Sequence, residues 1–246
     1  MSDGASASDP IAIADDHDAD TYAARFAAHG RVHIPDFLRA DDARRLQEAV
    51  ARRVRWNRLL IHDGPQTMSG AEWARLTPER RRTVEAEVAA AARVRFEGRF
   101  WNLELTDTGE PYAGDIRELV ELSRFLNEEP FLAFARIVTG MPAIDMADAQ
   151  ATLYRAGDFL HPHTDTDDTL GKNRLAAYVL NLTPNWKMEW GGLLSFPGPH
   201  GHVAESYVPA WNALNLLKVP QNHFVSSVAA FVDTGRYSVT GWLRRR

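Results

Sequence analysis

The spacing of apolar residues along the chain changes near residue 147. Before this point, apolar residues recur every three or four positions, as Leu46, Val50 and Val54 do, which is the spacing of one helix face. This pattern predicts a mainly helical first part with one short strand. The helices are expected at residues 21–29, 40–55, 70–92 and 115–139, and the strand at residues 31–34.

After residue 147 the chain consists of short extended runs separated by turn residues, with no helical pattern between them. A series of strands without intervening helices favours a sandwich or barrel over a parallel α/β fold. The helical first part would then support one face of the sheet. The strands are expected at residues 149–154, 159–165, 175–182, 192–196, 203–208, 213–219, 224–230 and 236–243.

An acidic segment precedes the patterned part of the chain. Residues 1–20 hold six aspartates and neither lysine nor arginine, whereas the whole chain has a net charge of −5. The remainder is therefore close to neutral, and we expect no nucleic-acid partner. We interpret residues 1–20 as a disordered acidic tail and residues 21–246 as a single domain. Within it, residues 21–146 would form helical support and residues 147–246 the β core.

Composition excludes several classes of protein. The 246 residues include no cysteine, which excludes disulfides, thiolate metal sites and a cysteine nucleophile. Phosphate-binding glycine loops and a G-x-S-x-G turn are also absent, against nucleotide chemistry and serine hydrolysis. No apolar run suits a membrane helix, and Met1–Pro10 lacks a secretory signal pattern, so we expect a cytoplasmic protein without a membrane partner. A tightly held metal must use histidine and carboxylate ligands.

The segment from Tyr154 to Asp165 carries the most informative chemistry. Side chains alternate along a strand, so His163 and Asp165 point the same way and can bind one ion. His161 shares that face and is an alternative ligand. His223 heads a later strand and is the candidate third ligand, because barrel closure brings distant strands together. Two histidines and one carboxylate on one side of an ion leave its other positions open, which suits non-haem Fe(II).

The last predicted strand carries a candidate anion site. Arg236, Ser238 and Thr240 lie on one of its faces by the same alternation. An arginine that faces a barrel interior is costly unless it holds an anion. The planar guanidinium matches a carboxylate, so this face predicts a carboxylate receptor beside the metal site.

Together these motifs resemble the iron- and 2-oxoglutarate-dependent oxygenases, and within them the prolyl-4-hydroxylase-like group. The resemblance extends over nearly the whole chain after residue 21. The segments that carry it are Phe26–Leu38, Tyr154–Asp165, Tyr178–Leu182, Trp190–Pro197, His223–Val228 and Arg236–Trp242.

The resemblance implies an α+β, mainly β fold: a double-stranded β-helix, or jelly roll, with N-terminal helices packed on one sheet. It implies a dioxygenase that uses Fe(II), 2-oxoglutarate and O2 to hydroxylate an unactivated C–H bond, with ascorbate as a candidate reductant. The implied Fe(II) ligands are His163, Asp165 and His223. Arg236 is implied to bind the distal carboxylate of 2-oxoglutarate. The residues implied to lie around the cosubstrate are Tyr154, Tyr178, Ser238 and Thr240.

The substrate and some roles stay open at this point. A prolyl or other residue of a protein is the favoured substrate, and a free amino acid or small metabolite is the alternative. We interpret residues 55–70 and 167–172 as loops that form a substrate lid, with Asp167 and Asp168 as candidate substrate contacts. His200 and His202 form a turn that could hold a surface metal.

Two other functional classes compete with the dioxygenase. The first is a cupin-like metal enzyme that uses His161 and His163 and no 2-oxoglutarate. The second is a non-enzymatic binding module that has kept the fold.

Overall fold

The computed structural model describes residues 9–106, 115–166 and 173–246. The helices are α1 (Ala19–His29), α2 (Ala40–Arg52), α3 (Gly70–Arg75), α4 (Pro78–Ala91), α6 (Arg117–Phe125) and α7 (Glu129–Thr139). Two short 3₁₀ turns, η1 (Met188–Trp190) and η2 (Pro199–Gly201), lie between later strands. No helix of the described residues is long and apolar enough to cross a membrane.

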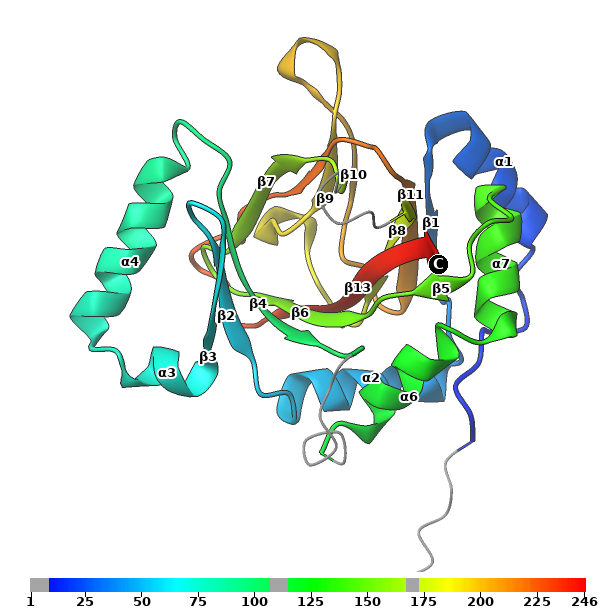
Figure 1. The fold of residues 1–246 in the computed structure, drawn as a ribbon, viewed down its shortest axis with the longest axis horizontal. Helices are drawn as coiled ribbons and strands as arrows, with labels where there is room; N and C mark the ends of the chain where they lie inside the picture. The colour runs from blue at the N-terminus through cyan, green and yellow to red at the C-terminus, as the bar shows by residue number, and fades with distance from the viewer. Residues whose placement is uncertain (1–8, 107–114, 167–172) are drawn as a thin grey trace, which may run out of the picture.

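The strands form one antiparallel sheet that curls into an almost closed barrel (Figure 1). Their order in the sheet is β1-β11-β8-β13-β6-β4-β7-β12-β9-β10. The strands of the first part are β1 (Arg31–Ile34), β2 (Asn57–Ile61), β3 (Pro65–Ser69), β4 (Gly98–Glu104) and β5 (Met146–Ala147). Those of the second part are β6 (Gln150–Tyr154), β7 (Phe159–His163), β8 (Asn173–Asn181), β9 (Leu194–Pro197), β10 (Val203–Tyr207), β11 (Ala213–Lys218), β12 (His223–Val225) and β13 (Arg236–Arg245). The expected jelly-roll architecture is confirmed.

Side chains close the barrel between β1 and β10, the two ends of the strand order. Arg31 Nε donates to Glu205 Oε2 at 2.6 Å, and the rings of His33 and Tyr207 lie 5.5 Å apart. Arg31 also lies over the Phe196 ring, 4.4 Å from its centroid. These contacts hold the two end strands together without a backbone ladder between them.

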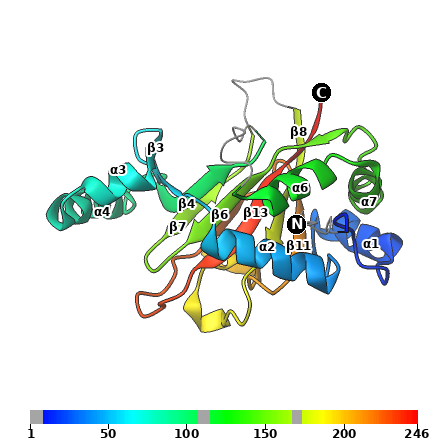
Figure 2. The same ribbon diagram turned by 90° about the horizontal axis from the view of Figure 1, so that it is seen from below.

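Helices α1, α2, α6 and α7 cover one outer face of the barrel (Figure 2). Residues such as Leu46, Leu119 and Phe131 bury their side chains against outward residues of the sheet, among them Leu180 and Val239. Burying this apolar surface is the main stabilising contribution of the helical layer. The predicted packing of N-terminal helices on one sheet is therefore correct.

Residues 55–70 differ from the loop that we expected. They contain a hairpin made of β2 and β3, and β2 pairs with β4 at the side of the sheet. Asp63 and Gly64 make its turn, both at positive φ, and Asp-Gly is a strong hairpin signal that the sequence offered. The strand expected at residues 224–230 is also shorter, because β12 ends at Val225.

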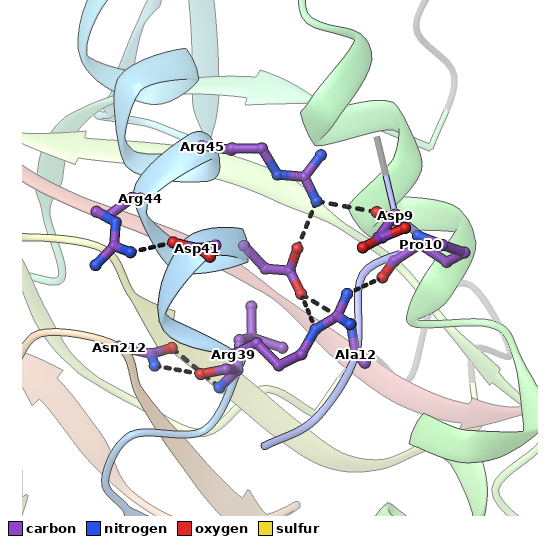
Figure 3. Close-up of polar contacts among 10 residues, drawn as sticks. Asp9, Pro10, Ala12, Arg39, Asp41, Arg44, Arg45 and Asn212 are labelled. Atoms are coloured by element: carbon purple, nitrogen blue, oxygen red, sulfur yellow. Dashed lines mark hydrogen bonds and ion pairs between the residues drawn. The ribbon is translucent and has the colours of Figure 1, made fainter. Parts of the chain in front are cut away.

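Part of the expected disordered tail packs on the helical layer. Ile11 is buried, and Ile13 makes a β-bridge with Leu38. Figure 3 shows Arg39 donating to the Pro10 carbonyl and Arg45 donating to the Asp9 carbonyl. The Asp42 carboxylate fixes this segment, since it accepts from the Ala12 amide at 3.2 Å and from Arg39 Nε at 2.8 Å. Residues 9–18 therefore cover the start of α2, and the acidic composition alone misled the prediction. Residues 1–8 lie outside the described residues.

Replacing Asp42 should destabilise the fold far more than replacing its neighbour Asp41. The Asp42 side chain is 3% exposed and also accepts from Arg45, whereas the Asp41 side chain is 85% exposed and pairs with Arg44. We expect Asp42→Ala to lower the free energy of unfolding by about 2 kcal/mol, because several donors lose their acceptor. Asp41→Ala should lower it by less than about 1 kcal/mol. Urea denaturation of the two variants measures both values, and equal losses would contradict this account of the N-terminal segment.

Candidate active site

The barrel encloses a cavity of about 440 Å³. Inward residues of β4, β6, β8 and β13 form one wall, and residues of β7 and β12 form the opposite wall. Much of the lining is apolar, as at Leu59, Phe100, Leu160 and Val225. The few polar groups therefore interact with one another and with any bound molecule in surroundings that hold little water.

His163, Asp165 and His223 converge in this cavity. One nitrogen of each histidine and one carboxylate oxygen lie within 4.8 Å of one another. Asp165 Oδ1 is 3.5 Å from His163 Nε2, and Asp165 Oδ2 is 3.5 Å from His223 Nε2. His163 and His223 are directly paired across β7 and β12. The three residues singled out in the sequence are thus brought together in space.

The orientation of each imidazole is set by a backbone carbonyl two residues earlier. His163 Nδ1 donates to the carbonyl of His161, and His223 Nδ1 donates to that of Gln221, both at 2.9 Å. In the neutral form of each ring, these bonds leave an unprotonated Nε2 atom that faces Asp165 and can bind a metal. A second hydrogen bond of this kind is how metal-binding histidines are usually oriented.

The protonation of the cluster suits a divalent cation. Burial lowers the pKa of His223, so its ring is neutral and Nε2 can donate an electron pair. Burial would raise the pKa of Asp165, but hydrogen bonding to His163 and the charges of both histidines lower it below its usual value. Burial also disfavours the charged form of His163, yet its hydrogen bond to Asp165 raises the pKa of that ring. The cluster is an anion flanked by two imidazoles, a ligand set that Fe(II) accepts.

His161 lies apart from this cluster, contrary to the simple alternation we assumed. Between β7 and β12, Leu160 pairs with Val225 and His163 pairs with His223, so β7 contains one extra residue. This bulge turns His161 away from the cavity, where its Nδ1 lies 3.4 Å from the Glu97 amide nitrogen and 3.2 Å from the Arg95 carbonyl oxygen. The geometry therefore supports the assignment of Asp165 and disfavours the cupin-like pair of His161 and His163.

Arg236 is a buried cation at the other side of the cavity. Its residue is 2% exposed, and burial lowers the pKa of its guanidinium. Within the described residues it makes no hydrogen bond or ion pair, and its Nε atom is both inaccessible and unpartnered. Gly192 leaves room for it, because a Cβ there would lie 3.2 Å from Arg236 Cδ. An unpaired buried cation is costly, so this position fits a ligand carboxylate.

The neighbours of Arg236 complete the floor of the cavity. Tyr154 pairs with Arg236 across β6 and β13, and the guanidinium carbon lies 5.0 Å from the Tyr154 ring centroid. The Tyr154 ring also stacks on Phe100, and burial raises the pKa of its hydroxyl, which stays protonated as a donor. Thr240 lies further along β13 on the same face as Arg236, and it also lines the cavity. Ser238 faces inward but is fully buried and shares a 2.8 Å hydrogen bond with Thr152.

Tyr178 does not take the place expected for it. The residues on either side of it, Ala177 and Val179, face the cavity. The Tyr178 ring therefore lies on the other face of β8, where it packs in the core under the helices while it still borders the cavity. Its hydroxyl donates to the Asp148 carbonyl at 2.6 Å, and its ring packs edge-on against Phe131. The strand was predicted correctly, and a cosubstrate contact for this tyrosine stays a prediction.

Other candidates fall outside the site. His200 and His202 lie at η2 and join no metal-sized cluster in the described part of the chain. Asp167, Asp168 and the rest of residues 167–172 lie outside the described residues. Leu59, Ile61 and Phe96 also line the cavity and were not predicted; the first two lie in residues 55–70, which were interpreted as a loop.

Comparison with known proteins agrees with this geometry. Residues 149–244 match the model of the 2OG-Fe(II) oxygenase superfamily. This stretch begins just before β6 and ends within β13, so it contains the three clustered side chains and Arg236. This stretch of the chain resembles a 2OG-Fe(II) oxygenase domain. The resemblance seen in the sequence is therefore confirmed, and the cofactors of such a domain are Fe(II), 2-oxoglutarate and O2.

Relatives of the oxygenase domain include prolyl hydroxylases. A curated relative, Prolyl 3-hydroxylase OGFOD1 of Mus musculus, is 32% identical over 149 residues. That match covers 56% of this chain and 25% of the mouse protein, so this chain corresponds to about a quarter of its relative.

Solved structures share the fold of the oxygenase domain. A prolyl-4-hydroxylase of Pseudomonas putida has a TM-score of 0.57 at 19% identity, with 93% of this chain and 99% of the other covered. A 2OG-Fe(II) oxygenase family oxidoreductase of Burkholderia pseudomallei has a TM-score of 0.60 at 14% identity, with 94% and 93% covered. A Trichoplax adhaerens prolyl hydroxylase, solved with a peptide fragment of hypoxia inducible factor, has a TM-score of 0.56 at 13% identity, with 92% and 88% covered.

Substitution of His161 and Asp165 should separate the two ligand assignments. We expect Asp165→Ala to weaken Co(II) binding at least about 100-fold, since a ligand is lost, and His161→Ala to change it by less than about threefold. Titration of the protein with Co(II), followed by the visible absorption of the metal, measures both affinities. Loss of binding in His161→Ala with full binding in Asp165→Ala would reverse the assignment.

Proposed function

We propose that this chain is an Fe(II)- and 2-oxoglutarate-dependent dioxygenase that hydroxylates an unactivated C–H bond. The observation that carries the proposal is the pairing, within one cavity, of the His163–Asp165–His223 cluster with the buried and unpartnered Arg236. A metal site alone suits many enzymes. A metal site that shares a cavity with an unpaired arginine suits a cosubstrate that is both a metal ligand and a dicarboxylate.

Each residue has a distinct task in this proposal. His163, Asp165 and His223 would hold Fe(II) on one side, which leaves its remaining positions for 2-oxoglutarate and O2. Arg236 would pair with the distal carboxylate, and the Tyr154 hydroxyl and Thr240 would donate to it. The apolar lining excludes water from the reacting atoms. Bound Fe(II) supplies O2 activation, and the overall reaction converts substrate, 2-oxoglutarate and O2 into hydroxylated substrate, succinate and CO2.

We infer that the substrate is a prolyl or other residue within a protein, as the name of the mouse relative suggests. Charge in the cavity supports a peptide over a free amino acid. Among the described residues that line it, Arg236 is the sole lysine or arginine. A free amino acid would bring a carboxylate that competes with 2-oxoglutarate for this cation, whereas a residue inside a peptide has none. The cytoplasmic location stays a prediction from the sequence.

Matched substrates test the class directly. We expect succinate release, measured with Fe(II) and 2-oxoglutarate, to rise with peptides that contain proline and have blocked termini. Free proline, other free amino acids and the same peptides with alanine in place of proline serve as comparisons. Turnover of the free amino acid alone would favour the small-molecule alternative. No stimulation by any substrate, together with no binding of 2-oxoglutarate, would leave the binding module as the better description.

Removing the charge of Arg236 should weaken 2-oxoglutarate binding and spare the metal. A charge-assisted hydrogen bond contributes about 1.5–3 kcal/mol, so Arg236→Met should raise the apparent KM for 2-oxoglutarate about 10- to 100-fold. Methionine keeps much of the apolar stem and limits the loss of packing. Co(II) affinity should stay within about threefold of the wild type. Arg155→Met is the matched control, because Arg155 is exposed and lies over Trp101 on the outer face. An unchanged dependence on 2-oxoglutarate in Arg236→Met would contradict the assignment.

A further inference from the structure

The three clustered side chains are not held in the same way. His163 ends β7 and His223 begins β12, so their backbones belong to a ladder and their rings are fixed by local carbonyls. Asp165 lies two residues beyond the end of β7, outside any described strand. Its carboxylate is nevertheless only 12% exposed and sits between the two imidazoles. Something other than the ladder must hold it there.

Arg174 supplies a backbone contact from the neighbouring sheet wall. Arg174 lies at the start of β8, and its Nη1 donates to the Asp165 carbonyl at 3.0 Å. The same guanidinium lies over the indole of Trp242, 3.6 Å from the ring centroid. This stacking fixes the plane of the guanidinium, because arginine and tryptophan make the strongest pair of this type.

Trp242 is the platform on which this guanidinium lies. It belongs to β13, beside β8, and it lines the cavity as Arg236, Thr240 and Asp165 do. A register shift between Leu243 and Arg244 brings Arg174 back over Trp242.

We propose that Arg174 and Trp242 are positioning residues that hold Asp165 in place as a metal ligand. The proposal rests on the proposed function and adds a role for two residues outside the ligand set. Arg174 anchors the backbone of Asp165, and Trp242 holds the Arg174 guanidinium in place through the stack. Residues of this kind typically change metal affinity 10- to 100-fold when replaced.

The test compares metal binding across three variants of the full chain. Arg174→Met keeps the apolar stem but removes the donor and the charge. Arg174→Lys keeps the charge but loses the planar stack, and Trp242→Leu removes the aromatic face on which the guanidinium lies. The matched control is Arg245→Met, an exposed arginine of β13 that pairs in register with the residue before Arg174. Co(II) titration, the Co(II) visible spectrum and thermal unfolding of the metal-free protein are measured for each.

We expect Arg174→Met and Trp242→Leu to weaken Co(II) binding about 10- to 100-fold and to alter the spectrum, because the carboxylate no longer holds its position. Arg174→Lys should give an intermediate loss. The unfolding temperature without metal and the affinity for 2-oxoglutarate of the Co(II)-saturated Arg174 variants should match those of Arg245→Met. A purely structural role would lower the unfolding temperature and leave the spectrum of the bound metal unchanged.

The two proposals fail in different ways. If the wild type binds Co(II) and the Arg174 and Trp242 variants bind it with the same affinity and spectrum, the positioning role is wrong and the proposed function stands. If one of these variants does not fold, the other two still decide the outcome. If the wild type itself binds no Co(II), both the proposed function and the positioning role are wrong.

Discussion

The pairing of β7 with β12 is the contact on which the site depends. It places His163 directly opposite His223, although the two residues are far apart along the chain. The two histidines lie side by side only while β7 and β12 keep this register, and the neighbouring strands of the sheet support it. The helical layer then buries the outer face of the sheet and fixes its curvature. A one-residue slip of β12 would turn His223 out of the cavity.

The cavity is largely apolar, so a charged group inside it is costly unless it has a partner. Arg236 is buried without a partner in the described chain, while Asp165 is buried between two imidazoles. A fold optimised only for stability would not keep an unpaired guanidinium inside a largely apolar cavity. Binding of a metal and a dicarboxylate would neutralise both charges at once. Binding of the metal and the dicarboxylate would thus offset the free-energy cost of burying these two charges.

Much of the fold and the centre of the site could be predicted from the sequence, and the errors have physical causes. The alternation of side chains placed His163 with Asp165 and Arg236 with Thr240. It failed at His161, because a bulge adds a residue to β7, and it left the orientation of Tyr178 open, because a strand pattern does not say which face meets the cavity. Ile11 shows a third cause: burial of a few apolar residues outweighed the acidic composition around them.

The position of the Asp165 carboxylate cannot be predicted from local sequence rules, because this residue lies beyond the end of β7. In the proposed arrangement, its fixed position comes from Arg174 and Trp242, which belong to other strands and form no motif with it. The two histidines inherit their geometry from the ladder, so their positions follow once the strands are in register. The carboxylate inherits its geometry from a stacked pair of side chains that the strand register does not fix. Of the three ligands, Asp165 is therefore the one whose position depends on side-chain packing outside the ladder.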